Sequence, residues 1–196
     1  GAYETFVEQN RSWLEDYALF TALKDTLGGK PWLEWPEALR LRKADALAEK
    51  RRELSDEIRL QYFVQYEFDR QWKALRSYAN AKGVRIIGDV PIYVPLDSAD
   101  VWANPELFQL DESRYPEQVA GCPPDSFTAD GQLWGNPIYD WKKMAQTHYF
   151  WWIQRLTAAG KLYDVIRLDH FRGFESYWSV PAGDTTARNG KWVKGP

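Results

Sequence analysis

The segment Lys161–Phe174 constrains the fold more than any other part of the chain. Its residues from Tyr163 to Leu168 predict a short buried strand, because they are rich in β-formers and follow a glycine that breaks the preceding segment. Side chains alternate along a strand, so Arg167 and Asp169 are expected on the same face. A guanidinium beside a carboxylate favours the ionised acid. The pair has two interpretations at this point, a structural ion pair that closes the strand or a catalytic carboxylate at its end.

A second strand is predicted over residues 84–90, and it also ends in an acid, Asp89. Residues 91–140 then show no long periodic segment, residues 139–159 predict a helix, and the strand 163–168 follows. This order predicts an α/β fold built on a parallel βαβ unit, with an insertion after its first strand. If the two strands are neighbours, Asp89 and Asp169 lie at the same rim, and the insertion covers it. Two carboxylates, an arginine and an aromatic loop then converge on one pocket.

The first part of the chain predicts helices over residues 2–28, 44–52 and 55–83. Ser55 is a candidate N-cap for the third of these. The apolar residues spaced along this helix, which include Phe68 and Leu75, are expected to belong to the core. The aromatic segment 30–36 is predicted to be a loop that packs onto the core.

Composition excludes several classes of partner. The chain of 196 residues has a net charge of −3, which does not suggest nucleic-acid binding. Cys122 is the only cysteine and there are two histidines, so we expect no disulfide, no metal site, no cofactor and a reducing compartment. No apolar run approaches the length of a membrane span, so no membrane contact is expected. Aromatic residues make up 16% of the chain, and their faces suit both a core and the apolar faces of sugar rings.

Several motifs in order resemble the amylomaltases, which are bacterial 4-α-glucanotransferases of glycoside hydrolase family 77, and the similar plant disproportionating enzymes. The motifs are Trp13–Phe20, Ile87–Val94, Asp97–Trp102, Gly121–Asp125, Gly131–Pro137, Arg167–Phe174 and Gly190–Lys194. The resemblance covers essentially the whole chain. It implies a TIM (β/α)8 barrel of the α-amylase superfamily. It also implies an enzyme that cleaves an α-1,4-glucan and passes the glucanosyl unit to the 4-hydroxyl of another glucan.

The resemblance also implies roles for individual residues. Asp169 matches the catalytic nucleophile, Arg167 the arginine that orients it, and Asp89 the acid that holds the sugar at the cleavage site. Two further matches, Gln132 and Trp134, fall in a loop that closes over the glucan. His170 follows the nucleophile at the pocket wall. The expected partners are α-1,4-glucans and maltooligosaccharides, and the expected location is the cytoplasm, or the plastid for a plant protein.

One departure from the family pattern concerns the remaining catalytic groups. The family's general acid/base Glu and a further stabilising Asp lie on later strands, whereas this sequence ends at Pro196 and has its only methionine at 144. We therefore expect an internal piece of a longer protein with an incomplete barrel, inactive when isolated; Glu175 is a poor substitute for the missing acid. The expected division is a helical region over 1–53 and a partial barrel over 54–196, with 91–140 as a subdomain over the active site. A glucan-binding module without turnover and a retaining hydrolase of the same superfamily remain as alternatives.

Overall fold

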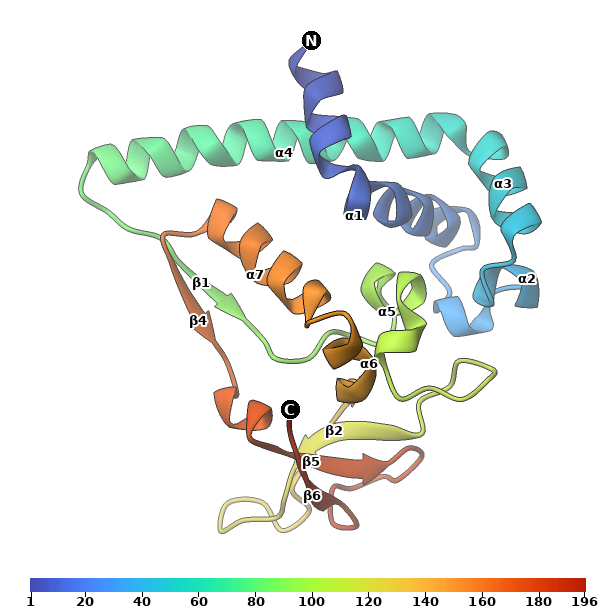
Figure 1. Ribbon diagram of the computed structural model, residues 1–196, viewed down its shortest axis with the longest axis vertical. Coiled ribbons are helices and arrows are strands. Elements are labelled where there is room, and N and C mark those ends of the chain that lie inside the picture. The colour runs from blue at the N-terminus through green and yellow to red at the C-terminus, as the bar shows by residue number, and fades with distance from the viewer. The chain divides into compact units, whose positions relative to one another are not determined.

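The computed structural model describes residues 1–196, which form two compact units, Gly1–Val84 and Arg85–Pro196 (Figure 1). The first unit is helical. Its elements are α1 (Ala2–Thr26), the 3-10 turn η1 (Trp32–Glu34), α2 (Glu37–Arg40), α3 (Ala44–Glu53) and α4 (Ser55–Ala81). The helices predicted over 2–28, 44–52 and 55–83 are confirmed to within two residues at each end.

The core of the first unit forms around one face of α1, which buries residues such as Leu14, Leu19 and Leu23. The aromatic segment after α1 packs as predicted, because Trp32 and Trp35 are both almost fully buried. The ring of Trp35 lies 5.3 Å from that of Phe20, between centroids. These two tryptophans therefore hold the connection against the helix that precedes it.

The predictions for α4 were wrong in two respects. Ser55 is not an N-cap: Leu54 occupies that position, and no side chain caps the helix. The apolar stripe is also not a core face, since Ile58 is the only buried residue of α4 and Phe68 and Leu75 are 48% and 55% exposed. Helical periodicity identifies an apolar face, but it does not say whether another segment covers that face.

The second unit contains the predicted parallel strand pair (Figure 1). Strand β1 (Ile87–Val90) pairs with β4 (Val165–Leu168), and Asp89 lies opposite Arg167 in the register. Both strands begin later than predicted, at residues 87 and 165, and the prediction of a buried strand was wrong, since no residue of β4 is buried. Helix α7 (Phe150–Leu162) contacts both strands, so the βαβ arrangement is confirmed.

The helix predicted over 139–159 is two helices. The first, α6 (Trp141–Gln146), is capped by Asp140, whose carboxylate accepts a hydrogen bond from the Lys143 amide at 3.0 Å. His148 and Tyr149 then adopt left-handed backbone angles, with φ of 51° and 56°, before α7 begins. Consecutive left-handed residues cannot continue a right-handed helix. The prediction of one helix was therefore wrong, because apolar spacing runs on across the break.

The excursion after β1 contains more regular structure than its sequence predicted. It includes α5 (Ala99–Ala103), the 3-10 turn η2 (Pro105–Leu107), and the strands β2 (Gln118–Cys122) and β3 (Gln132–Pro137). After β4 the chain forms the 3-10 turn η3 (Phe171–Phe174) and then β5 (Ser176–Pro181) and β6 (Lys191–Lys194). The last four strands form an antiparallel sheet in the order β3-β2-β5-β6. Residues 91–140 hold only short elements, in line with the absence of a long periodic segment, and the pairing of β2 with β5, far along the chain, was not predicted.

The second unit therefore has a mixed α/β fold, with a two-stranded parallel sheet and a four-stranded antiparallel one. Tyr139 is fully buried and lies at the centre of an aromatic core. Its ring centroid is within 6 Å of those of Tyr93, Phe108, Trp141, Trp151 and Trp152. No helix of the chain has both the length and the apolar character needed to cross a membrane.

Candidate functional site

The candidate site begins at the ends of β1 and β4, where Arg167 links two carboxylates. Its Nη1 donates to Asp89 Oδ2 at 2.7 Å, and its Nη2 donates to Asp169 Oδ1 at 2.6 Å. The parallel register sets this geometry, because it places Arg167 opposite Asp89, and strand alternation places Asp169 on the same side. The Asp169 amide also donates to the Val90 carbonyl at 3.0 Å, which extends the pairing past the strand. The predicted convergence of these three residues is confirmed.

All three side chains are accessible, with exposed fractions of 59% for Arg167, 57% for Asp89 and 50% for Asp169. Each carboxylate uses one oxygen for the arginine, and the contacts leave the other oxygen available. An exposed ion pair contributes little to stability. The arrangement therefore fits side chains that bind a ligand better than it fits an ion pair that only stabilises the strand.

Gln132, Trp134 and His170 form a second part of the site. The ring of Trp134, on β3, meets the ring of His170 edge to face, with 4.9 Å between centroids and 89° between planes. Its Nε1 donates to Gln132 Oε1 at 3.1 Å. Because His170 directly follows Asp169, this ring contact brings the β3 segment beside the carboxylates. The structure thus brings all six predicted site residues together.

His170 has an unusual local structure. Its backbone is left-handed, with φ of 51°, and its carbonyl accepts a hydrogen bond from the Gly173 amide at 2.8 Å. Burial lowers the pKa of the His170 imidazole and the Arg172 charge lowers it further, while Asp169 acts in the opposite direction. Its buried Nε2 has no hydrogen-bond partner in the chain. An imidazole nitrogen can act as a hydrogen-bond donor or acceptor, so this buried atom has bonding capacity that the chain does not use.

Glu175, the acid considered as a substitute for a general acid, follows η3. Its carboxylate accepts a hydrogen bond from the Ser176 hydroxyl at 2.6 Å. It thus bonds to its neighbour on the strand that leads away from the carboxylate pair. Nothing in its contacts gives it a part in the chemistry of Asp169.

Sequence reasoning did not single out Tyr93 and Arg155, which the structure brings near the site, or the exposed ring of Phe127. Tyr93 lies between Tyr139 and Trp134, with ring centroids 5.8 Å and 6.3 Å away. Arg155 donates to the carbonyl of the residue before Tyr93. Phe127 is 96% exposed on a turn that Asp125 holds by accepting the Phe127 and Thr128 amides, each at 2.8 Å. The proline-bounded Asp125 turn was visible in the sequence, but the exposure of the ring after it was not.

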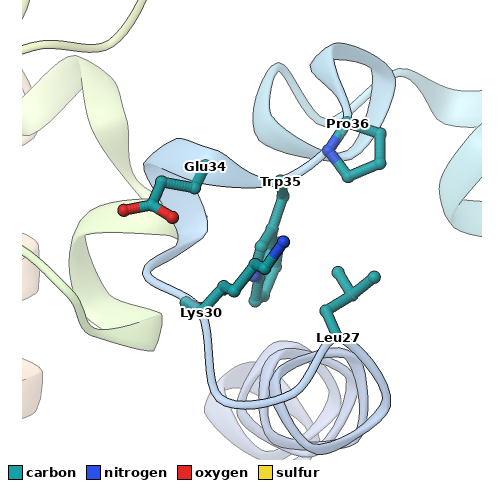
Figure 2. Close-up of a pocket in the computed structure, with 5 residues that line it drawn as sticks. All are labelled: Leu27, Lys30, Glu34, Trp35 and Pro36. Atoms are coloured by element: carbon teal, nitrogen blue, oxygen red, sulfur yellow. The ribbon is translucent and has the colours of Figure 1, made fainter.

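The first unit has a pocket of its own, of about 370 Å³, shown in Figure 2. It is lined by Leu27, at the end of α1, and by Lys30, Glu34, Trp35 and Pro36 from the connection that follows. Figure 2 shows the Glu34 carboxylate directed away from Trp35. The pocket holds no pair of carboxylates and none of the predicted site residues. The candidate site is therefore the Asp89–Arg167–Asp169 cluster.

Comparison with known proteins identifies the family. Residues 1–196 match glycoside hydrolase family 77, described as 4-alpha-glucanotransferase. Curated relatives named 4-alpha-glucanotransferase include those of Clostridium butyricum, 50% identical over 100% of this chain and 40% of the relative, and Thermus thermophilus, 51% identical over 100% and 39%. The relative from Solanum tuberosum, described as chloroplastic/amyloplastic, is 46% identical over 94% of this chain and 32% of its own.

Solved structures agree with the sequence relatives. An amylomaltase from Streptococcus agalactiae, solved in complex with acarbose, superposes with a TM-score of 0.94 at 45% identity, over 99% of this chain and 39% of that protein. The chain spans about 40% of the length of the curated relatives named above from bacteria. With a family match over every residue, the chain belongs to the 4-alpha-glucanotransferase family, glycoside hydrolase family 77.

Proposed function

We propose that the protein containing this chain is a 4-α-glucanotransferase, which moves an α-1,4-glucan segment to the 4-hydroxyl of an acceptor glucan or glucose. One observation carries the proposal beyond family membership. Arg167 bridges Asp89 and Asp169 at 2.7 and 2.6 Å, at the ends of two neighbouring parallel strands, with all three side chains half or more exposed. The ends of parallel strands are where α/β enzymes place their catalytic groups.

Asp169 acts as the nucleophile in this proposal. Its free carboxylate oxygen attacks the anomeric carbon, the glycosidic C–O bond breaks, and the departing oxygen takes a proton from the general acid. The acceptor's 4-hydroxyl then attacks the same carbon, gives up its proton, and returns Asp169 as a carboxylate. Two inversions retain the α-configuration. Arg167 orients Asp169 through its hydrogen bond to one carboxylate oxygen, and Asp89 holds sugar hydroxyls at the cleavage site.

Gln132, Trp134 and His170 form the wall that favours transfer over hydrolysis. Transfer requires an acceptor sugar that is well placed and a site from which water is excluded. The edge-to-face contact of Trp134 with His170 and its hydrogen bond to Gln132 support this role, because they fix an aromatic surface beside the nucleophile. Trp134 is still 37% exposed, so part of its ring is available to a sugar.

We further propose that β1 and β4 belong to a (β/α)8 barrel, with 1–53 as a helical region, 54–196 as part of the barrel and 91–140 as a subdomain over the active site. The parallel pairing of β1 and β4 with α7 between them in sequence supports this. We propose, from the family resemblance, that the general acid/base Glu and the stabilising Asp lie on later strands. We propose a cytoplasmic location, or a plastid one in plants, as for the potato relative.

The test uses the full-length protein with Asp169→Asn. The amide keeps the shape of the carboxylate and loses its charge, so we expect transfer from maltotriose to be abolished while binding of acarbose, measured by calorimetry, survives. Asp56→Asn is the matched control, since Asp56 is also exposed and paired with an arginine, Arg59, at 2.8 Å. Normal redistribution of chain lengths by the Asp169→Asn protein would contradict the assignment.

The same assay separates the alternative functions. A hydrolase would release glucose from maltotriose without forming longer chains. A glucan-binding module would bind acarbose and leave maltotriose unchanged. The unmodified protein is expected to give glucose together with chains longer than maltotriose, which differs from the products of a hydrolase and from the unchanged maltotriose of a binding module.

A further inference from the structure

Two side chains from separate segments hold the carbonyl of Ile92, three residues past Asp89. The Tyr139 hydroxyl donates to this oxygen at 2.6 Å, and Arg155 Nη1, from α7, donates to it at 3.2 Å. Ile92 is 3% exposed and Tyr139 is fully buried. A buried carbonyl that loses its donors costs free energy, so these two bonds set the path of the segment that leaves β1.

The side chain of Ile92 connects this segment to the nucleophile. Gly173 faces it so closely that a Cβ atom at 173 would lie 2.6 Å from Ile92 Cδ1 and 3.0 Å from His170 Cδ2. The Gly173 amide in turn donates to the His170 carbonyl. A shift of Ile92 would therefore be transmitted through Gly173 to His170, the residue next to Asp169.

Tyr93 provides a second connection from the same segment. Its ring stacks on Tyr139, with 25° between planes, and its centroid lies 6.3 Å from that of Trp134. Trp134 meets His170 edge to face. The two routes from Ile92 and Tyr93 thus end at the same histidine.

Arg155 has a largely buried guanidinium that lies beside two tryptophan rings. Its guanidinium carbon is 4.9 Å from the Trp152 ring centroid and 5.5 Å from that of Trp151. Burial lowers the pKa of Arg155, while Tyr139 and the Asp100 carboxylate of α5 act in the opposite direction. Taking a charge out of water costs free energy that its partners must offset. Stability alone is therefore a weak reason for an arginine here.

We propose that Arg155, together with Tyr139, is a positioning residue for glucan transfer: it fixes the Ile92 carbonyl and thereby the placement of Asp89 and His170 around the reacting sugar. Neither residue touches the substrate in this proposal. The inference rests on the proposed function, and it adds a group of residues to the site that lies behind the sugar-binding wall.

The test compares Arg155→Met, Arg155→Lys, Tyr139→Phe and the double variant Arg155→Met/Tyr139→Phe in the full-length protein. Met keeps the apolar stem of arginine and removes the donor, and Phe removes only the hydroxyl. Gln154→Met, at an exposed position on the same helix, is the matched control. Maltotriose disproportionation gives kcat and KM, and hydrogen exchange measured by mass spectrometry follows the peptide 168–174.

A misplacement of about 1 Å can cost about 100-fold in rate. We expect kcat to fall about tenfold in Arg155→Met and in Tyr139→Phe, with KM changed less than threefold. In the double variant, kcat should fall by more than the product of the two single effects, because in each single variant one donor still bonds to the Ile92 oxygen. Arg155→Lys should recover part of the loss. Exchange in 168–174 should become faster in the double variant and stay unchanged in Gln154→Met.

Unchanged kcat and unchanged exchange in a folded double variant would overturn the proposal, as would a loss of kcat that only follows a lower melting temperature. An unmodified protein that does not redistribute maltotriose would instead refute the proposed function. The exchange measurement still tests the positioning role in that case, because it does not depend on turnover.

Discussion

Replacing Arg167 by lysine separates the two interpretations of the Asp89–Arg167–Asp169 cluster. The guanidinium donates through two nitrogens to two carboxylates at once, at 2.7 and 2.6 Å. A lysine ammonium is a compact charge on a flexible stem and does not reproduce this fixed fork. The change therefore removes the geometry of the bridge while it keeps the positive charge.

The expected effects on stability and on activity differ widely. The three side chains are 50–59% exposed, and exposed ion pairs contribute about 0.2–1 kcal/mol each. Both pairs together then stabilise the fold by less than about 2 kcal/mol, which corresponds to a melting shift of a few degrees. A displaced nucleophile, by contrast, lowers the rate about 100-fold for a shift of about 1 Å. If the cluster is catalytic, Arg167→Lys loses activity and keeps its stability.

The assay measures maltotriose redistribution and thermal melting on the same full-length Arg167→Lys protein. Arg70→Lys is the control, since Arg70 is as exposed as Arg167, at 59%, and pairs with Glu67 at 2.7 Å on α4. We expect the control to match the unmodified protein in both measurements. A variant at Arg167 that keeps its activity within about threefold and melts many degrees lower would refute the catalytic interpretation and support a structural ion pair.

Three further predictions concern single residues in the full-length protein. Trp134→Ala should raise the ratio of glucose release to chain-length redistribution, because an open wall admits water; an unchanged ratio would mean that Trp134 only packs. Gly88→Ala should lower the melting temperature, since a Cβ there would overlap the Tyr163 ring, whereas Gly160→Ala, with open space, should not. Burial lowers the pKa of His170 below its ordinary 6.5, so the unfolded chain binds a proton at this histidine more readily than the folded chain does. The neutral His170 therefore contributes to the free energy of unfolding at neutral pH, and this contribution is lost as the pH falls below about 6.5. Melting from pH 7.5 to 5 should therefore fall less steeply in His170→Asn, and equal slopes would contradict this.

The sequence by itself predicted the parallel pair at the centre of the site. Two β-branched segments that each end in an acid, with a helix before the second, favour a parallel pair, because a crossover that contains a helix joins parallel strands. Strand alternation then put Arg167 and Asp169 on one face, and the structure confirms their contact. The helices α1, α3 and α4 were also predictable, since apolar spacing and glycine stops are local signals.

The tertiary structure decided what depends on distant partners. Strands β2 and β3 are short and each contains a glycine, and they are strands because they pair with each other and because β2 also pairs with β5. The left-handed pair His148 and Tyr149 divides a segment whose apolar pattern is continuous. Arg155 and Tyr139 meet at the Ile92 carbonyl from positions that share no motif with it. Propensity and periodicity report on neighbours along the chain, whereas pairing, burial and hydrogen-bond partners are fixed by residues that only folding brings near.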